Sequence, residues 1–149
     1  MKLRLALAII TLSLTGISTS ASQTTEPTID QMLAALETQF ALSALPPALR
    51  DQATVYRLDP TKGYQPARQG TSGVTCLVER TAWEMADFRN AIYIPLCYDA
   101  VGTKTYLRVI MDAAALRTQG MSPDALKAEI ESRYTSKSYD VPEKAGVLI

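Results

Sequence analysis

Apolar and polar residues alternate with different periods along this chain. Between Ile29 and Ser43, apolar residues recur every three or four positions, which predicts an amphipathic helix. Thr28 and Gln31 form a capping-box pattern at its start, and Pro46 follows its end. Pro47 then opens a single turn that extends to Asp51. We interpret the apolar side of the helix as a core face, the alternative being a face for a partner protein. This side comprises Ile29, Met32, Leu33, Leu36 and Phe40, and the other faces carry Asp30, Gln31, Glu37 and Gln39.

Short runs in the middle of the chain have the two-residue period of strands. Strands are predicted at Ala53–Asp59, Tyr64–Arg68 and Val74–Val78, joined by turns at Asp59–Gly63 and Gln69–Gly73. The proline inside the second run favours an edge position, because proline cannot donate to a sheet ladder. Together these runs predict a three-stranded antiparallel meander.

The pattern changes between Glu79 and Tyr93, where charged and aromatic side chains interleave. A short helix is predicted from Trp83 to Arg89. The segment from Ile92 to Cys97 then returns the chain to within disulfide reach of the sheet.

Two further helices are predicted after residue 100. The first is largely buried, contains a pair spaced for an ion pair, Arg108 and Asp112, and ends near Gly120. The second begins at Ser122 and Pro123, because serine caps helices and proline is favoured at their first position. The apolar residues of the first are Tyr106, Leu107, Val109, Ile110, Met111, Ala113, Ala114 and Leu116, and those of the second are Leu126, Ile130 and Tyr134. The predicted fold is therefore α+β, with a small antiparallel sheet, one N-terminal helix and two C-terminal helices.

The first 21 residues have the pattern of a secretory signal peptide. Lys2 and Arg4 are positive, residues 5–14 are apolar, and small residues follow at Ser20 and Ala21. The alternative is a membrane anchor, but the apolar run is well short of the ~20 residues that a span needs. We therefore predict a signal peptide at 1–21, a flexible leader at 22–27 and a single domain at 28–149, exported to the periplasm or the extracellular space.

The segment from Val141 to Ile149 stops on three apolar residues and resembles the start of a strand. One interpretation is a natural edge strand at the C-terminus. The interpretation that we favour is a chain that continues past Ile149.

The charge and composition of the chain limit the classes of partner that it is predicted to bind. The chain has 149 residues, with 15 basic and 15 acidic side chains. Without Lys2 and Arg4 the balance is 13 to 15, a net charge of −2. Such a chain lacks the basic surface that binds phosphate backbones, so nucleic acid is not predicted as a partner. No later segment is long and apolar enough to predict a membrane span after signal removal.

The two cysteines, Cys76 and Cys97, are the only ones in the chain. In an oxidising compartment, a lone pair of cysteines is typical of one disulfide. Closing a loop of this length stabilises a fold by about 3 kcal/mol in the chain-entropy model. The alternative is a reactive thiol, which needs a base or a cation beside it, and the chain contains no histidine.

Most familiar catalytic chemistry is absent. Without histidine, Ser-His-Asp hydrolysis, Cys-His hydrolysis and ordinary zinc sites are excluded within this chain. No Cys-x-x-Cys, Walker loop or dinucleotide fingerprint is present. We predict no cofactor, no metal site and no catalytic residue. The alternative is a small secreted hydrolase that uses two carboxylates, drawn from Glu79, Glu84, Asp87 and Asp99.

Four strings stand out: GVTCLVERTAWE from Gly73, ADFRN from Ala86, PLCYD from Pro95 and VIMDAAA from Val109. Together they resemble a group of uncharacterised secreted bacterial proteins, over most of the chain after the signal peptide. The resemblance implies export. Members of the group continue past the position of Lys144 into further apolar and histidine-containing segments, so the resemblance also favours an incomplete chain. It implies no activity and transfers no catalytic residue.

The charged and aromatic loop between the cysteines is the predicted recognition surface, because a disulfide limits its motion and Trp, Tyr and Arg are favoured anchors at interfaces. The alternative is that its aromatic residues fill the core beneath it. The function that we predict is a non-catalytic exported protein that binds an unknown protein or small ligand through loop 76–97. The candidate recognition residues are Glu79, Arg80, Trp83, Phe88, Arg89 and Tyr93.

Overall fold

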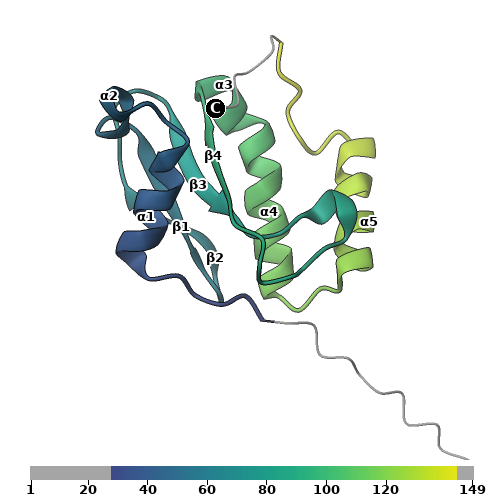
Figure 1. Cartoon of the computed structure of the whole chain (residues 1–149). Coiled ribbons are helices and arrows are strands. Elements are labelled where there is room, and N and C mark those ends of the chain that lie inside the picture. The colour runs from purple at the N-terminus through teal and green to yellow at the C-terminus, as the bar shows by residue number, and fades with distance from the viewer. Residues whose placement is uncertain (1–27, 144–149) are drawn as a thin grey trace, which may run out of the picture.

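A computed structural model describes residues 28–143 of the chain. The predicted signal peptide and leader, and most of the predicted C-terminal strand, lie outside these residues. In chain order the elements are α1 (Ala34–Ser43), α2 (Pro47–Arg50), β1 (Thr54–Asp59), β2 (Gly63–Arg68), β3 (Thr75–Glu79), the 3-10 turn η1 (Trp83–Met85), β4 (Ile94–Tyr98), α3 (Ala100–Lys104), α4 (Tyr106–Thr118) and α5 (Pro123–Thr135) (Figure 1). The predicted α+β class is confirmed.

The strands form one mixed sheet in the order β2-β1-β3-β4. The predicted three-stranded meander is wrong, because β3 pairs with β1 in parallel and β4 adds a fourth strand antiparallel to β3. In a meander, β2 would be the central strand and Pro66 would interrupt its ladder. The observed order places β2 at an edge, paired only with β1 among the described strands, as its proline favours.

The segment from Gln69 to Val74 carries the chain from one side of β1 to the other. The Gly70 amide donates to Thr54 Oγ1 at 3.0 Å, and the next two amides donate to the Gln52 carbonyl. A Cβ atom on Gly70 would lie 2.2 Å from that carbonyl oxygen, so only glycine fits this crossing. This close passage over the start of β1 replaces the predicted hairpin turn.

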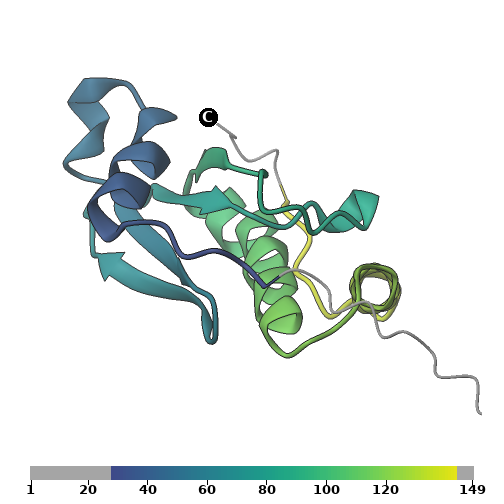
Figure 2. The ribbon, with the colours of Figure 1, turned by 60° about the horizontal axis from the view of Figure 1, so that its bottom comes forward.

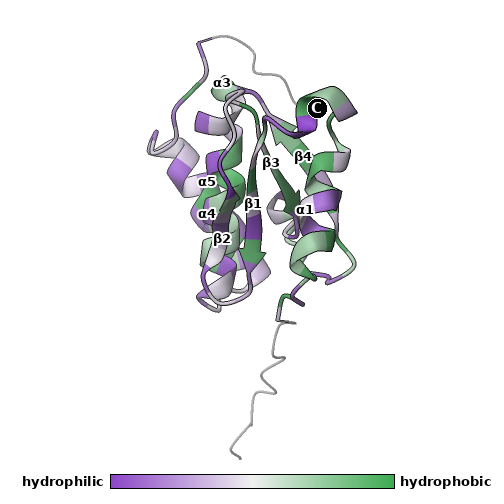
Figure 3. Ribbon diagram, turned by 90° about the vertical axis from the view of Figure 1, so that its left-hand side faces the viewer, coloured by the Kyte–Doolittle hydropathy of each residue, from purple (hydrophilic) through white to green (hydrophobic). Residues whose placement is uncertain are grey.

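Helices cover both faces of the sheet. Helix α1 packs on one face, α4 packs on the other, and α5 lies outside α4 (Figure 2). Alternate residues of β3 point to opposite faces, so Val78 packs with α1 and Leu77 packs with α4. Strands β3 and β4 are mainly hydrophobic, whereas polar residues occur on β1, β2 and the helices (Figure 3).

Helix α1 begins at Ala34, so the predicted start at Ile29 and the capping box are wrong. Residues 28–33 instead run along the loop before β4, where Asn90 Nδ2 donates to the Thr28 carbonyl at 2.7 Å. The predicted apolar side is wrong in part: Leu33 and Leu36 are exposed, whereas Ile29 is buried and Met32 and Phe40 pack against the core. The buried residues of α1 are Glu37, Ala41 and Leu42.

The C-terminal helices follow the prediction in most respects, although Tyr106 and Tyr134, predicted on their apolar faces, are 44% and 47% exposed. Ser122 Oγ accepts from the Ala125 amide, which confirms the predicted cap of α5. Arg108 pairs with Asp112 across one turn of α4 at 3.5 Å. The single helix predicted after residue 100 is divided into α3 and α4 at Thr105, where the backbone departs from helical angles.

Candidate functional site

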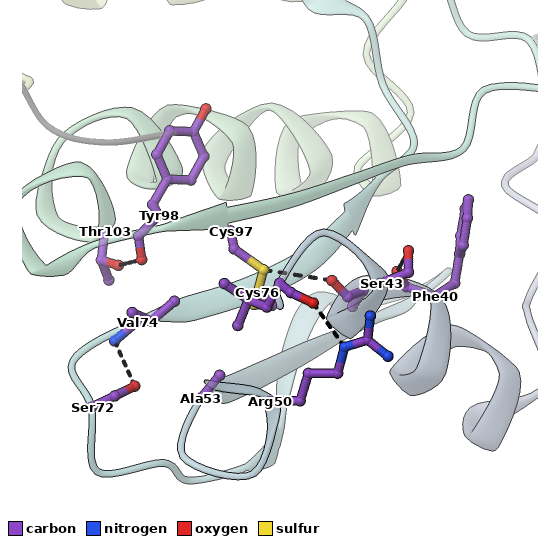
Figure 4. The surroundings of a disulfide bond; sticks show 12 residues. Phe40, Ser43, Arg50, Ala53, Ser72, Val74, Cys76, Cys97, Tyr98 and Thr103 are labelled. Atoms are coloured by element: carbon purple, nitrogen blue, oxygen red, sulfur yellow. Dashed lines mark hydrogen bonds between the residues drawn. A yellow bond between two sulfur atoms is a disulfide. The ribbon is translucent and has the colours of Figure 1, made fainter. Parts of the chain in front are cut away.

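The predicted disulfide is present and joins two neighbouring strands of the sheet. Cys76 and Cys97 lie opposite each other on β3 and β4, with their Cα atoms 4.1 Å apart. Both are fully buried on the α1 side, and the ring of the next residue, Tyr98, points to the α4 side (Figure 4). The bond therefore fixes the base of loop 76–97 within the sheet, instead of joining the sheet to a helix.

Arg80 holds the inner side of this loop. Its side chain is buried and donates to three backbone carbonyls, those of Asp30, Asn90 and Ile92, at 2.8 to 3.1 Å. Its guanidinium also lies 3.9 Å from the centre of the Tyr93 ring. One buried side chain thus ties the segment before α1 to both arms of the loop.

Arg117 of α4 holds the other end of the loop. It is buried and donates to the carbonyls of Arg80 and Phe88, at 2.7 and 2.6 Å. Its guanidinium stacks over the Phe88 ring, 4.5 Å from the ring centre. Together, the hydrogen bonds of Arg80 and Arg117 to these backbone carbonyls hold the loop in its path.

The helix at the tip of the loop is shorter than predicted. The helix predicted from Trp83 to Arg89 is a single 3-10 turn that ends at Met85. Ala82 and Asp87 exchange two backbone hydrogen bonds, at 3.1 and 3.2 Å, and these close the chain into a small hairpin. A longer helix is incompatible with this pairing.

The predicted recognition residues divide into two groups. The side chains of Glu79, Arg80 and Phe88 are buried, Trp83 is half-buried, and Arg89 and Tyr93 are exposed. Two apolar residues of the loop that the sequence did not single out, Met85 and Ile94, are also exposed, Met85 to 72%. We call Met85, Arg89, Tyr93 and Ile94 the outer surface of the loop.

Two stacked pairs of aromatic rings come from four separate elements. Trp83 of η1 stacks with Tyr134 of α5, with ring centres 6.1 Å apart. Tyr98 of β4 stacks with Tyr106 of α4 at 6.2 Å. The sequence does not indicate this grouping, because the four residues share no spacing and are brought together only by the fold.

Glu79 lies at the end of β3 with its side chain on the α4 face, two residues after Leu77. It is 9% exposed and makes no hydrogen bond or ion pair within residues 28–143. Burial, together with the nearby charge of Glu84, raises the pKa of Glu79 to about 7. Burial and the charges of both glutamates raise the pKa of Tyr98 to about 12, and the charge of Glu84 also contributes to a raised pKa of Tyr134. The charges of Glu79 and Glu84 therefore both affect the pKa of Tyr98.

The other two carboxylates considered for catalysis are engaged elsewhere. Asp87 accepts from the Arg89 amide and pairs with the Arg89 guanidinium at 2.7 Å, and these contacts lower the pKa of Asp87. Asp99 caps α3 by accepting from the Gly102 amide at 2.8 Å. Only Glu79 and Glu84 remain as a candidate pair.

A shallow pocket of about 230 Å³ lies between the start of α1 and strands β1 and β2. Glu37 lines it, but its carboxylate accepts from the Leu58 amide at 2.7 Å. β1 and β3 pair over only two residue pairs, so this amide has no strand partner there. Burial raises the pKa of Glu37. Its contact completes the sheet, so we assign Glu37 a structural role.

Within the described residues, no three side chains of His, Cys, Asp or Glu lie close enough to hold a metal ion. No helix in residues 28–143 has the length and apolar character needed to cross a membrane. Comparisons with protein-family models, with curated proteins and with solved structures found no match to this chain. The membership of a secreted bacterial group therefore stays a prediction.

Proposed function

We propose that this protein is an exported, non-catalytic binding protein that contacts a partner or ligand through the outer surface of the disulfide-closed loop. The observation that carries the proposal is the contrast between the two sides of the loop. Its inner side is held by the disulfide, Arg80 and Arg117. Its outer surface exposes Met85, Tyr93 and Ile94. A rigid support loses little conformational entropy on binding, and exposed apolar side chains supply the contact area.

The proposed export is supported by the disulfide, because such bonds persist in oxidising compartments. The resemblance of the Thr75 to Asp99 run to secreted bacterial proteins points the same way.

Site-specific photo-crosslinking tests the proposed surface. A photoreactive phenylalanine analogue is placed at Met85 or Ile94, and, as controls, at Leu36 or Leu49, which are exposed on α1 and α2. The protein is then irradiated in the cells or medium that produce it. We expect a discrete adduct, seen as a mass shift, from the loop positions only. Adducts of equal yield from the α1 and α2 positions, or none from the loop, would contradict the proposal.

A carboxylate-based hydrolase is the second candidate. The observation that favours it is Glu79, whose pKa of about 7 lies in the range of a general acid at neutral pH, beside Glu84. A panel of chromogenic glycosides and esters tests this candidate. Turnover that is lost in Glu79→Gln and kept in Asp87→Asn would support it, and no turnover by the unmodified protein would remove it.

A further inference from the structure

We propose that the pocket between the start of α1 and strands β1 and β2 binds a free α-amino acid, whose carboxylate pairs with Arg57 and whose ammonium group lies beside Glu37 and Asp59. All three side chains line this pocket. The inference goes beyond the proposed function, because no residue that lines the pocket belongs to loop 76–97.

The fold places charged side chains on the floor of the pocket. Val55 packs with α1, and because side chains alternate along a strand, Arg57 and Asp59 lie on the same face of the sheet as Val55. Gln65 lies opposite Arg57 on β2. Residues 65–67 of β2 are exposed, so this face of the sheet is open to solvent beyond the edge of α1.

The first observation is a cation at the pocket without a partner. Arg57 is half-buried, and its guanidinium makes no hydrogen bond or ion pair with any residue of 28–143. Arg68 of the neighbouring strand, in contrast, donates to the carbonyls of Arg50 and Ala53. A guanidinium presents its N–H donors in a planar fork that matches a carboxylate, so Arg57 suits the carboxylate of a ligand.

The second observation is a buried carboxyl group that is only half engaged. Glu37 is 2% exposed, and its Oε1 accepts from the Leu58 amide, whereas its Oε2 has no donor among the described residues. Burial raises the pKa of Glu37, and the Leu58 amide and the charge of Arg57 oppose this rise. Glu37 and Arg57 thus line one pocket and sense each other's charge, yet they form no ion pair within residues 28–143. A ligand can therefore lie between the two opposite charges.

Asp59 supplies a second carboxylate. Its Oδ1 accepts from the hydroxyl and the amide of Thr61, at 2.7 and 2.8 Å. These hydrogen bonds lower the pKa of Asp59, so its carboxylate is ionised at neutral pH. The pocket therefore carries a negative charge beside the positive charge of Arg57.

Charge and size together select the class of ligand. The two carboxylates disfavour a simple anion, and Arg57 disfavours a simple cation, whereas a zwitterion presents the opposite charge to each. The pocket volume of about 230 Å³ is below the ~300 to 1,000 Å³ of pockets for drug-sized ligands, which favours a molecule as small as an amino acid. Met32 and Pro66 add apolar surface for its side chain.

An NMR titration of the ¹⁵N-labelled protein tests the pocket. L-alanine, L-leucine and L-glutamine are added separately at pH 7 and constant ionic strength. Each is paired with the analogue that lacks its ammonium group and the one that lacks its carboxylate, such as 4-methylpentanoate and 3-methylbutylamine for leucine. We expect saturable shifts of the Leu58, Asp59 and Gln65 amides with at least one amino acid, and at least tenfold weaker binding of both its analogues. No saturable shift with any of the three, or equal affinity for either analogue, would overturn the inference.

Variants then locate the two charges of the ligand. Arg57→Gln should weaken amino-acid binding about tenfold, the usual cost of one charged hydrogen bond. Arg108→Gln is the matched control, because Arg108 lies on α4 and pairs with Asp112, and its affinity should not change. Asp59→Asn keeps an oxygen for Thr61 and removes the charge, so it should weaken the amino acid about threefold and strengthen the carboxylate analogue. Equal affinities in the two arginine variants, or a loss for both ligands in Asp59→Asn, would overturn the inference.

The failure of this inference differs from failure of the proposed function. Crosslinks from Met85 or Ile94 without amino-acid binding would leave the binding function of the loop in place and remove the pocket as a site. Amino-acid binding without such crosslinks would confirm the pocket and remove the outer surface of the loop as a contact region.

Discussion

Glu79 and Arg80 are adjacent in the chain and both buried, yet the fold treats them in opposite ways. Arg80 donates to three carbonyls and lies over the Tyr93 ring. Glu79 points to the α4 side of the sheet, where no described residue binds its carboxylate. A buried charge with all its partners supplied by the fold is part of the structure. A buried charge without a partner lowers stability, and such groups are typical of functional sites.

The largest expected effect on stability comes from replacing Arg80. In Arg80→Met, three carbonyls of two chain segments lose their donor, so we expect the free energy of unfolding to fall by about 3 to 5 kcal/mol. Urea denaturation measures the change. Arg89→Met is the control, because the Arg89 side chain is 74% exposed and its surface pair with Asp87 contributes less than about 1 kcal/mol. Equal losses in the two variants would show that Arg80 does not hold the loop.

Replacing Glu79 is expected to change the free energy of unfolding in the opposite direction. Because the pKa of Glu79 is about 7 in the folded protein and its usual value is 4.5, the folded state holds the proton more tightly. Stability therefore falls as pH rises from about 4.5 to 7 and stays lowered above that range. We expect Glu79→Gln to raise the free energy of unfolding at pH 8, by up to about 3 kcal/mol, and to change it little at pH 4.

Urea denaturation of Glu79→Gln at the two pH values makes this test, with Asp87→Asn as the control. The contacts of Asp87 with Arg89 lower the pKa of Asp87, so that variant should gain no stability at pH 8. A loss of stability in Glu79→Gln at pH 8 would mean that a partner stabilises the ionised Glu79 carboxylate.

The smallest expected effect is a change in the pKa of Glu79 when Glu84 is replaced. The charge of Glu84 contributes to the raised pKa of Glu79, so Glu84→Gln should lower that pKa without returning it to 4.5, because burial is the larger cause. Carboxyl carbon shifts measured by NMR over a pH titration follow the Glu79 group directly. An unchanged titration curve would place Glu84 too far from Glu79 for the two to act as a catalytic pair.

The helices at the C-terminal end could be predicted from sequence because their signals are local. Ser122 caps α5 through its own hydroxyl, and Arg108 reaches Asp112 within one turn. The turn at Asp59–Gly63 between β1 and β2 is local for the same reason. The local prediction was wrong for residues 28–33. Their periodicity is helical, but hydrogen bonds to Asn90 and Arg80, far along the chain, hold them in another path.

The candidate site shows the same division. The sequence indicated the disulfide and the loop between its cysteines, because a lone pair of cysteines has one pairing. It did not distinguish the buried Glu79, Arg80 and Phe88 from the exposed Arg89 and Tyr93. Nor did it indicate that Trp83 stacks with Tyr134 and Tyr98 with Tyr106.

By itself, the sequence determined the α+β class, the disulfide, the end of α4 and the start of α5, since each depends on neighbours within a few residues or on a unique pair. Only the tertiary structure decided the strand order and the meeting of the aromatic rings, because these depend on contacts between distant segments. It also decided the contrast between Glu79 and Arg80. Their side chains leave the end of β3 in different directions, and the fold places carbonyl groups around one and, among the described residues, no donor beside the other.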